Sequence, residues 1–393
     1  MSPESTAPAS RNPVSTAPAS SRQSSPRSRR FELVRREMAR SGVQVVLCSL
    51  GADLPWLTGY EAMPLERLTM LVLPAESDPT LVVPALEAPR VEVEDSLFRL
   101  RPWAESEDPV SIVASLVGSA TRLAVSDRTW AVFLMALQDA LPDGRFCPSS
   151  KLTGPLRAVK DEAEIAVLAA AASAADRVAD QLMGGEVPLI GRSEADVSAD
   201  IGRRLVAEGH SRVNFAIVAS GPNSASPHHE PGSRLIEAGD PVVCDFGGSL
   251  TLDGSPGYCS DTTRTVVAGA IPDGFSEVYD AVRRAQADGV AAATVGARCA
   301  DVDSAARDVL TGAGLGEQFI HRTGHGIGLE EHEAPYIVST SVEQLEPGHA
   351  FSVEPGAYLP GRYGVRIEDI VVATEAGPRR LNVSCRELTV VDA

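Results

Sequence analysis

The sequence feature that most constrains this chain is a set of acidic and imidazole side chains in its C-terminal part, spaced along strand-like, often glycine-rich segments. The set consists of Asp245, Asp261, His325, Glu354 and Glu368. A carboxylate inside a buried strand is costly unless it has a partner, so these acids require compensating positive charge. Four carboxylates and a neutral imidazole balance two divalent cations. This composition is typical of a dinuclear hydrolase site.

The two aspartates lie in or beside adjacent strand-like runs. Asp245 stands within the run from Val242 to Gly247, which reads as a buried strand, and Asp261 opens the run that follows. Side chains alternate along a strand, so Asp261 and Thr263 are predicted to share a face. Thr263 can then form a hydrogen bond beside the metal site and support a ligand.

The next two candidate ligands are His325, which lies between glycines, and Glu354, which lies at the end of a strand-like run. His325 is flanked by glycines, which leave room for a ligand in a crowded centre. Glu354 ends a strand-like run that the following Pro-Gly pair terminates. Taken singly, each candidate has an ordinary explanation as a turn, a cap, a surface ion pair or a structural histidine. Their joint occurrence favours a metal site.

Glu368 lies in the run 364–372, which is predicted to form one strand. A period of two places Arg366 and Glu368 on the same face and turns Asp369 to the other face. Glu368 is therefore favoured over Asp369 as the bridging ligand. Arg366 beside it either holds Glu368 in place or binds the terminal carboxylate of a substrate, and we favour the first role.

The pattern of elements divides the chain into domains. At 393 residues the chain exceeds one ordinary core, so two domains are expected. Strands alternating with helices over 31–155 predict a small α/β domain. A helix–helix–sheet–helix–helix–sheet order over 156–393 predicts an α+β catalytic domain. Residues 1–30 are rich in Ser, Pro, Ala and Arg and are predicted to form a disordered tail.

The composition argues against several classes of partner. A net charge of −18 and a pI of about 4.9, without a basic stripe, argue against binding to nucleic acid or to an anionic membrane. The apolar runs are too short to span a bilayer. The six cysteines are scattered without CxxC spacing, which suggests neither a zinc ribbon nor a disulfide framework. Free thiols predict a cytoplasmic location.

Together, the segments around the candidate ligands resemble the pita-bread metallopeptidases, the family of methionine aminopeptidase, aminopeptidase P and Xaa-Pro dipeptidase (prolidase). The resemblance covers about residues 155–390, and the family's order of Asp, Asp, His, Glu and Glu is matched at every position. The matching segments are Asp245-Phe246-Gly247-Gly248, Ser260-Asp261-Thr262-Thr263-Arg264-Thr265, His325-Gly326-Ile327-Gly328, Glu354-Pro355-Gly356 and Val365-Arg366-Ile367-Glu368-Asp369.

The N-terminal domain is similar to that of the creatinase and prolidase type, on weaker matches. These are Leu57-Thr58-Gly59-Tyr60 and Leu156-Arg157-Ala158-Val159-Lys160. Because type I methionine aminopeptidases lack such a domain, the resemblance is closest to Xaa-Pro peptidases. It also implies a homodimer, since related two-domain enzymes are commonly dimers.

The resemblance implies roles for three side chains. Glu354 resembles the family residue that both binds metal and transfers the proton. His228 and His332 resemble the two histidines that orient the substrate and stabilise the tetrahedral intermediate, a task for which an imidazolium donor is expected. The adjacent His229 is predicted to be a solvated loop histidine.

The implied activity is hydrolysis of the peptide bond preceding proline in a small peptide, by a hydroxide that bridges two divalent metal ions. Oxygen-rich ligation favours Mn²⁺, with Co²⁺ or Zn²⁺ as alternatives. Three other functions stay open: an aminopeptidase P-like enzyme for longer peptides, a non-peptide C–N hydrolase on the same fold, and an inactive binding protein. The gap between Asp245 and Asp261 is longer than is usual in the family, and residues 251–256 are expected to form a hairpin tip that affects substrate choice.

Overall fold

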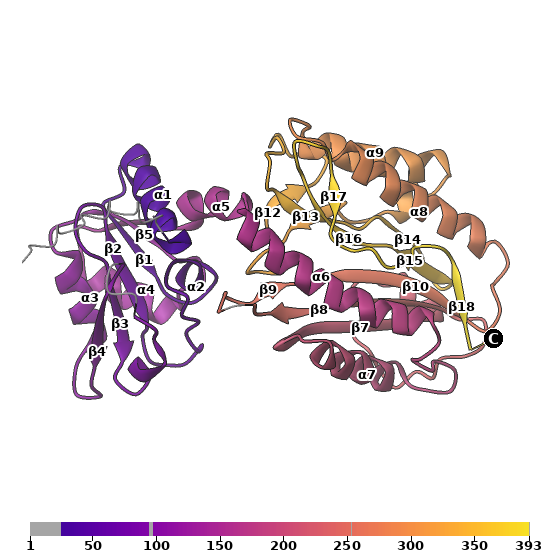
Figure 1. Ribbon diagram of the computed structural model, residues 1–393, viewed down its shortest axis with the longest axis horizontal. Helices are drawn as coiled ribbons and strands as arrows, with labels where there is room; N and C mark the ends of the chain where they lie inside the picture. The colour runs from indigo at the N-terminus through magenta and orange to yellow at the C-terminus, as the bar shows by residue number, and fades with distance from the viewer. Residues whose placement is uncertain (1–24, 94–96, 253, 393) are drawn as a thin grey trace, which may run out of the picture.

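The chain forms two domains that lie side by side (Figure 1). The computed structural model describes residues 25–93, 97–252 and 254–392. Helices α5 (Ser150–Ala158) and α6 (Glu162–Met183) run from the smaller N-terminal domain into the larger one. The predicted order, a small α/β domain followed by an α+β domain, is confirmed. Among the described residues, no helix combines the length and apolarity needed to cross a bilayer.

A six-stranded mixed sheet forms the centre of the N-terminal domain, in the order β4-β3-β2-β1-β5-β6. Its strands are β1 (Val45–Cys48), β2 (Met70–Pro74), β3 (Thr80–Pro84), β4 (Arg99–Trp103), β5 (Arg122–Val125) and β6 (Arg145–Pro148). Its helices are α1 (Pro26–Ser41), α2 (Asp53–Thr58), η1 (Ala88–Arg90), α3 (Pro109–Val117) and α4 (Ala131–Ala140). Alternate residues of β1 face opposite sides: Val46 packs with α1 and α2, and Leu47 packs with α3 and α4.

Helix α1 begins earlier than the sequence predicted. Its first residue is Pro26, and the Ser25 hydroxyl accepts a hydrogen bond from the Ser28 amide at 3.2 Å. A proline is well tolerated in the first turn, where its missing N–H would have no helical partner. The predicted tail over 1–30 is therefore wrong from residue 26 onward, and its residues 1–24 lie outside the described residues.

Two larger sheets and a two-stranded hairpin form the C-terminal domain. The first sheet has the order β18-β10-β8-β7 with β9 paired to β8, the second has the order β12-β11-β13-β16-β17, and β14 pairs with β15. The strands are β7 (Arg212–Ser220), β8 (Pro241–Leu250), β9 (Tyr258–Cys259), β10 (Thr262–Ala268), β11 (Gly324–Gly326), β12 (Glu333–Ile337), β13 (Ala350–Val353), β14 (Gly356–Leu359), β15 (Tyr363–Arg366), β16 (Asp369–Val372), β17 (Arg379–Arg380) and β18 (Thr389–Val391).

Helices cover both large sheets. Helices α6 and α7 (Glu194–Ala207) lie against the first sheet, whereas α8 (Phe275–Ala292) and α9 (Cys299–Gly312) lie against the second (Figure 1). Asp161 and Glu164 form a capping box that fixes the start of α6, and the Ser193 side chain caps α7. Short 3₁₀ helices, η2 (Gly221–Ala225) and η3 (Gly316–Gln318), complete the domain.

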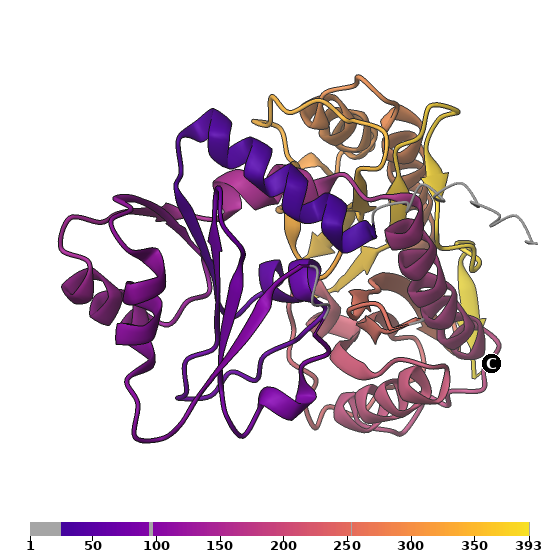
Figure 2. The same cartoon turned by 60° about the vertical axis from the view of Figure 1, so that its left-hand side comes forward.

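Buried polar contacts join the two domains where α1 lies beside α5 (Figure 2). Glu164, in the first turn of α6, accepts hydrogen bonds from the Trp56 indole at 3.1 Å and from the Tyr258 hydroxyl at 2.6 Å. Arg157 of α5 pairs with Asp53 of α2 at 3.0 Å. Buried polar networks of this kind favour one arrangement, so the junction holds the domains in a defined orientation.

Candidate metal centre

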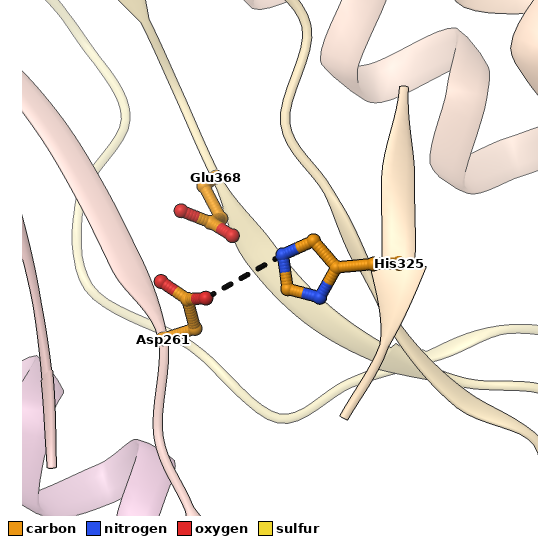
Figure 3. A group of neighbouring side chains, drawn as sticks. All are labelled: Asp261, His325 and Glu368. Carbon is orange, nitrogen blue, oxygen red and sulfur yellow. Dashed lines mark ion pairs between the residues drawn. The ribbon is translucent and has the colours of Figure 1, made fainter. Parts of the chain in front are cut away.

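Three of the predicted metal ligands form a tight cluster. Ligand atoms of Asp261, His325 and Glu368 lie within 4.8 Å of one another, and all three side chains are buried (Figure 3). Asp261 precedes β10 in the first large sheet, whereas His325 lies within β11 and Glu368 precedes β16, both in the second. The cluster therefore lies where the two sheets meet.

Asp245 and Glu354 flank this cluster. Asp245 lies in β8, where its register partner is Thr263 of β10. Glu354 follows β13, and its Oε1 lies 3.2 Å from Nε2 of His325. The charges of Asp245 and Glu354 both act on Asp261. The structure thus brings all the predicted ligands into one centre.

Two buried carboxylate oxygens in this centre have no hydrogen-bond donor among the described residues. They are Oδ1 of Asp245 and Oε1 of Glu368. Buried polar atoms are rarely left unpaired, so these two oxygens are suited to an additional partner. Carboxylate oxygens with one imidazole are ligands for divalent ions such as Mn²⁺, Co²⁺ or Zn²⁺. The donor set therefore fits a pair of divalent metal ions.

The electrostatics of the centre also favour cations. Burial raises the pKa values of Asp261 and Glu368 well above their ordinary range, and neighbouring carboxylates raise them further. Burial acts in the same direction on Glu354, but His325, His321 and Arg366 outweigh it and lower its pKa to about 2. Glu354 is thus firmly ionised, and the other acids are stabilised in their charged form by positive charge placed between them.

Thr263 supports Glu368 through both its side chain and its main chain. Its hydroxyl donates to Oε2 of Glu368 at 2.7 Å, and its carbonyl accepts from the Glu368 amide at 3.2 Å. The single strand expected over 364–372 is wrong, because β15 ends at Arg366 and β16 begins at Asp369 in another sheet. Local periodicity does not reveal this change of strand partner. Glu368 stands in the crossing from the β14–β15 hairpin to the second large sheet.

Arg366 is buried and heavily engaged. Its Nη2 donates to Oδ2 of Asp245 at 2.6 Å, and its Nε donates to the Thr263 hydroxyl at 3.1 Å. Its Nη1 donates to the Tyr358 hydroxyl at 2.8 Å. Arg366 therefore holds Asp245 directly and reaches the expected partner, Glu368, only through Thr263.

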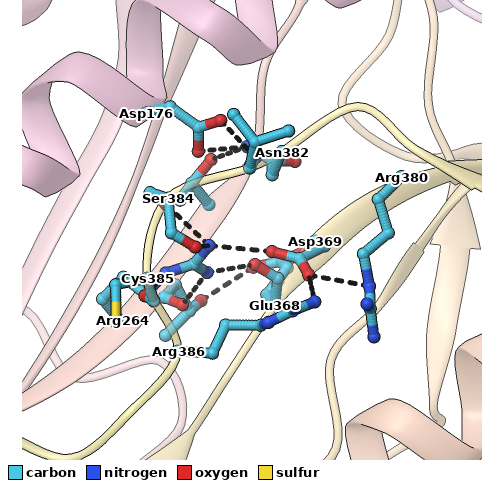
Figure 4. Close-up of polar contacts among 12 residues, drawn as sticks. Asp176, Arg264, Glu368, Asp369, Arg380, Asn382, Ser384, Cys385 and Arg386 are labelled. Atoms are coloured by element: carbon cyan, nitrogen blue, oxygen red, sulfur yellow. Dashed lines mark hydrogen bonds and ion pairs between the residues drawn. The ribbon is translucent and has the colours of Figure 1, made fainter.

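Asp369 points away from the centre, as the alternation predicted, and lies among arginines (Figure 4). It pairs with the fully buried Arg264 at 2.8 Å, with Arg386 at 2.9 Å and with Arg380 at 3.3 Å. Arg264 also donates to the main-chain carbonyl of Glu368 at 2.7 Å. This network fixes the backbone from which the Glu368 ligand projects.

The two predicted substrate-orienting histidines, His228 and His332, both reach the surface. The His332 ring lies edge-on to the His325 ring, with centroids 4.0 Å apart. Partial burial of its ring beside the centre, followed by the charges of His325 and Arg322, lowers the pKa of His332 to about 4. His332 is therefore neutral at pH 7, which corrects the expected imidazolium, although a neutral ring still offers one N–H. His228 is exposed, and its charge acts on His332.

His321 is a further member of the centre that the sequence analysis missed. Its Nε2 lies 2.9 Å from the Tyr358 hydroxyl, and its Nδ1 lies 2.7 Å from the carbonyl of Arg322. Burial lowers the pKa of His321 more than the nearby Glu354 carboxylate raises it. The signal that could have identified it is its position in the sequence, four residues before the ligand His325.

His229 is not the solvated histidine that was predicted. Its Nε2 lies 2.7 Å from Oε2 of Glu194, a fully buried carboxylate at the start of α7. Glu194 also accepts hydrogen bonds from the amide and the hydroxyl of Ser220, at 2.8 Å and 2.7 Å. A buried carboxylate requires several donors, so His229 belongs to this structural network.

A cavity of about 700 Å³ lies beside the metal centre, between the two domains. The β8–β9 hairpin, in which Leu250 pairs with Tyr258, carries the loop expected at 251–256. Residues from the N-terminal domain and from this loop line the cavity together with His332, which contacts the ligand His325; among them are Pro55, Glu61, Thr251 and Pro256. The long gap between the two aspartates thus forms part of an approach to the site.

Comparison with known proteins gives two domain matches. Residues 166–375 match metallopeptidase family M24, and residues 30–159 match the creatinase/prolidase N-terminal domain. The "Probable dipeptidase PepE" of Mycobacterium tuberculosis is 44% identical over 368 residues, which cover 93% of this chain and 96% of that protein. The Xaa-Pro dipeptidase of Lactobacillus delbrueckii subsp. lactis is 34% identical over 365 residues, which cover 90% of this chain and 96% of that protein.

Solved structures agree with these relatives. Dipeptidase PepE from Mycobacterium ulcerans has a TM-score of 0.85 at 43% identity, covering 93% of this chain and 98% of that chain. A prolidase from Thermococcus sibiricus has a TM-score of 0.87 at 34% identity, covering 94% and 100%. The resemblance noted in the sequence is confirmed. This chain belongs to metallopeptidase family M24, with a creatinase/prolidase N-terminal domain, and is a metal-dependent hydrolase.

Proposed function

We propose that the protein is an Xaa-Pro dipeptidase, which hydrolyses the peptide bond preceding proline with two divalent metal ions. The observation that carries the proposal is the convergence of buried acids at one centre, two of which keep an oxygen without a donor among the described residues. The ions would be held by the predicted ligands, Asp245, Asp261, His325, Glu354 and Glu368. Oxygen-rich ligation favours Mn²⁺ over Co²⁺ or Zn²⁺.

The chemistry divides between the ions and the protein. When bound, two divalent cations supply a water activated for attack and polarise the scissile carbonyl. Glu354, with a pKa of about 2, is ionised at neutral pH and can accept a proton from the attacking water. It would then deliver this proton to the departing proline nitrogen. Its position against His325 keeps it at the centre throughout.

Two histidines would orient the substrate. The neutral His332 offers an N–H toward the scissile carbonyl oxygen, where negative charge develops during attack. His228, which is exposed, would contact the peptide at the rim of the centre. Arg366 and Thr263 would act indirectly, by holding Asp245 and Glu368.

The names of the relatives support a dipeptide substrate. Those cited above are described as dipeptidases or prolidases, although an X-Pro aminopeptidase from Thermotoga maritima is also similar, at 29% identity and a TM-score of 0.78. A homodimer and a cytoplasmic location also stay predictions. Size-exclusion chromatography with light scattering tests the first, and cell fractionation tests the second.

The proposal is tested by turnover of Xaa-Pro dipeptides against Xaa-Pro-Yaa tripeptides, with Mn²⁺ added. Dipeptide cleavage should dominate, and Glu354→Gln and His325→Ala should each abolish it. Glu277→Gln, an exposed acid in the first turn of α8, serves as the matched control and should retain activity. Full activity of Glu354→Gln would contradict the mechanism, and preference for tripeptides would favour an aminopeptidase instead.

A further inference from the structure

A dipeptide differs from every longer peptide in where its negative charge lies. If the substrate is an Xaa-Pro dipeptide, as proposed above, its free carboxylate belongs to the same residue as the scissile nitrogen. One further residue moves the terminal carboxylate by roughly 3.8 Å. A cation placed to bind the carboxylate of the dipeptide therefore also distinguishes dipeptides from longer peptides.

The cations around the centre and the cavity are nearly all committed to acidic partners. Arg366 is paired with Asp245 at 2.6 Å, and the others pair with acids on the surrounding elements. These paired cations are Arg128, Arg157, Lys160 and Arg212. The charge of each of these side chains is already balanced by an acid, which weakens its attraction for a substrate carboxylate.

Arg322 is the exception. It lies in the run between His321 and His325, and within the described parts of the chain no ion pair or side-chain hydrogen bond is formed by its guanidinium. Its contact is instead with an aromatic ring, since Cζ lies 4.7 Å from the ring centroid of Tyr336. A cation on an aromatic face keeps its N–H groups available at the edge of the guanidinium plane.

The position of Tyr336 places this pair at the rim of the metal centre. Tyr336 of β12 is the register partner of His325 in β11, and directly opposed residues of an antiparallel pair project from the same face of a sheet. The Tyr336 side chain is 40% exposed, whereas His325 beside it is buried. Arg322, which stacks on this tyrosine, is half-buried, and its charge acts on His332 beside the metal ligand His325.

We propose that Arg322, oriented by Tyr336, binds the C-terminal carboxylate of the dipeptide substrate. The planar guanidinium presents two parallel N–H groups, which match the two oxygens of a carboxylate. A longer peptide places a neutral amide at this point, and Arg322 then gains no ion pair. Arg322 is thus a specificity-determining residue that favours dipeptides.

Paired substrates separate this role from a structural one. Ala-Pro and Ala-Pro amide share the scissile bond and differ in the charge that Arg322 is proposed to bind. Wild type should cleave Ala-Pro with the higher kcat/KM, and Arg322→Met should lower kcat/KM for Ala-Pro about 10- to 100-fold, mainly through KM, with little change for the amide. Arg322→Lys should restore part of the loss.

The control is Arg362→Met, which removes an arginine stacked on Tyr363 at 5.0 Å in the β14–β15 turn. It should leave the ratio of the two substrates unchanged. An equal loss on both substrates, or no loss on either, in a folded Arg322→Met protein would overturn the assignment while leaving the proposed function standing. No cleavage of either substrate by metal-loaded wild type would overturn the proposed function and this assignment together.

Discussion

Arg264 offers a demanding test of how the fold holds its metal ligands. The side chain is fully buried, and it donates to the carbonyl oxygens of Glu368 at 2.7 Å and Cys385 at 2.9 Å as well as to Asp369. Arg264→Met keeps an unbranched apolar stem but removes every one of these bonds. Breaking a buried ion pair by removing one partner costs about 3–5 kcal/mol.

The surroundings place the expected loss at the lower end of this range. Asp369 keeps two other cations, Arg386 at 2.9 Å and Arg380 at 3.3 Å, so its charge is not left alone. The main cost is then the buried carbonyl oxygens that lose their donor, at about 1–3 kcal/mol for each unsatisfied group. We expect the free energy of unfolding to fall by about 3 kcal/mol.

The measurement is urea unfolding of the metal-free protein, followed by calorimetric titration with Mn²⁺. Because Arg264 ties the Glu368 backbone to the strand that follows Asp261, its loss should also weaken Mn²⁺ binding. Arg386→Met is the matched control, since it removes a 31% exposed partner of the same carboxylate. Equal unfolding free energies for the two variants, with unchanged Mn²⁺ affinity, would refute the reasoning.

Three further predictions concern pH, metal and the domain junction. Burial, followed by Lys160, lowers the pKa of His349 from 6.5 to about 4, so the unfolded chain alone binds this proton between those values. Stability should therefore fall by up to about 3 kcal/mol as pH drops through this window, and urea melts of His349→Gln should lack that slope; an unchanged slope would contradict the assignment. Dialysis against a chelator should abolish Xaa-Pro cleavage and Mn²⁺ should restore it, whereas activity in protein shown to be metal-free would rule out the metal mechanism. Tyr258→Phe removes the 2.6 Å bond to Glu164 and should cost about 1–2 kcal/mol in urea unfolding, so an unchanged midpoint would show that this bond does not stabilise the junction.

The local features of the site could be read from the sequence because neighbouring residues of an extended chain point to opposite sides, even where the chain passes from one strand to another. Thr263 reaches Glu368, and Asp369 turns away toward Arg264, as a period of two predicts. The contacts that were missed depend on strands far apart in the chain. Arg366 bonds Asp245 because β15 and β8 meet in space, and nothing in the run around Arg366 specifies that meeting.

The wrong predictions for the strand over 364–372 and for His229 have the same cause. A hydrophobic run over 364–372 looks continuous, yet its two halves pair with β14 and β13 in different sheets. His229 reads as a loop residue until Glu194 is found buried against it. The order of the domains, by contrast, could be predicted from the sequence. It follows from the succession of segments with helical and strand periodicity and does not depend on any one contact between distant residues.

The ligands come from both halves of the catalytic domain: Asp245 lies in the first sheet and Asp261 directly precedes its strand β10, whereas His325 lies in the second sheet and Glu354 and Glu368 directly flank its strands β13 and β16. Ions held between them would act as a cross-link, and the folded state would gain about 2.7 kcal/mol at a free ion concentration of 100 times Kd. The lifetime of the protein would then follow the supply of the ion. Without the ion, the unfolded fraction would rise about 100-fold, and the protein would be degraded faster in a cell short of it.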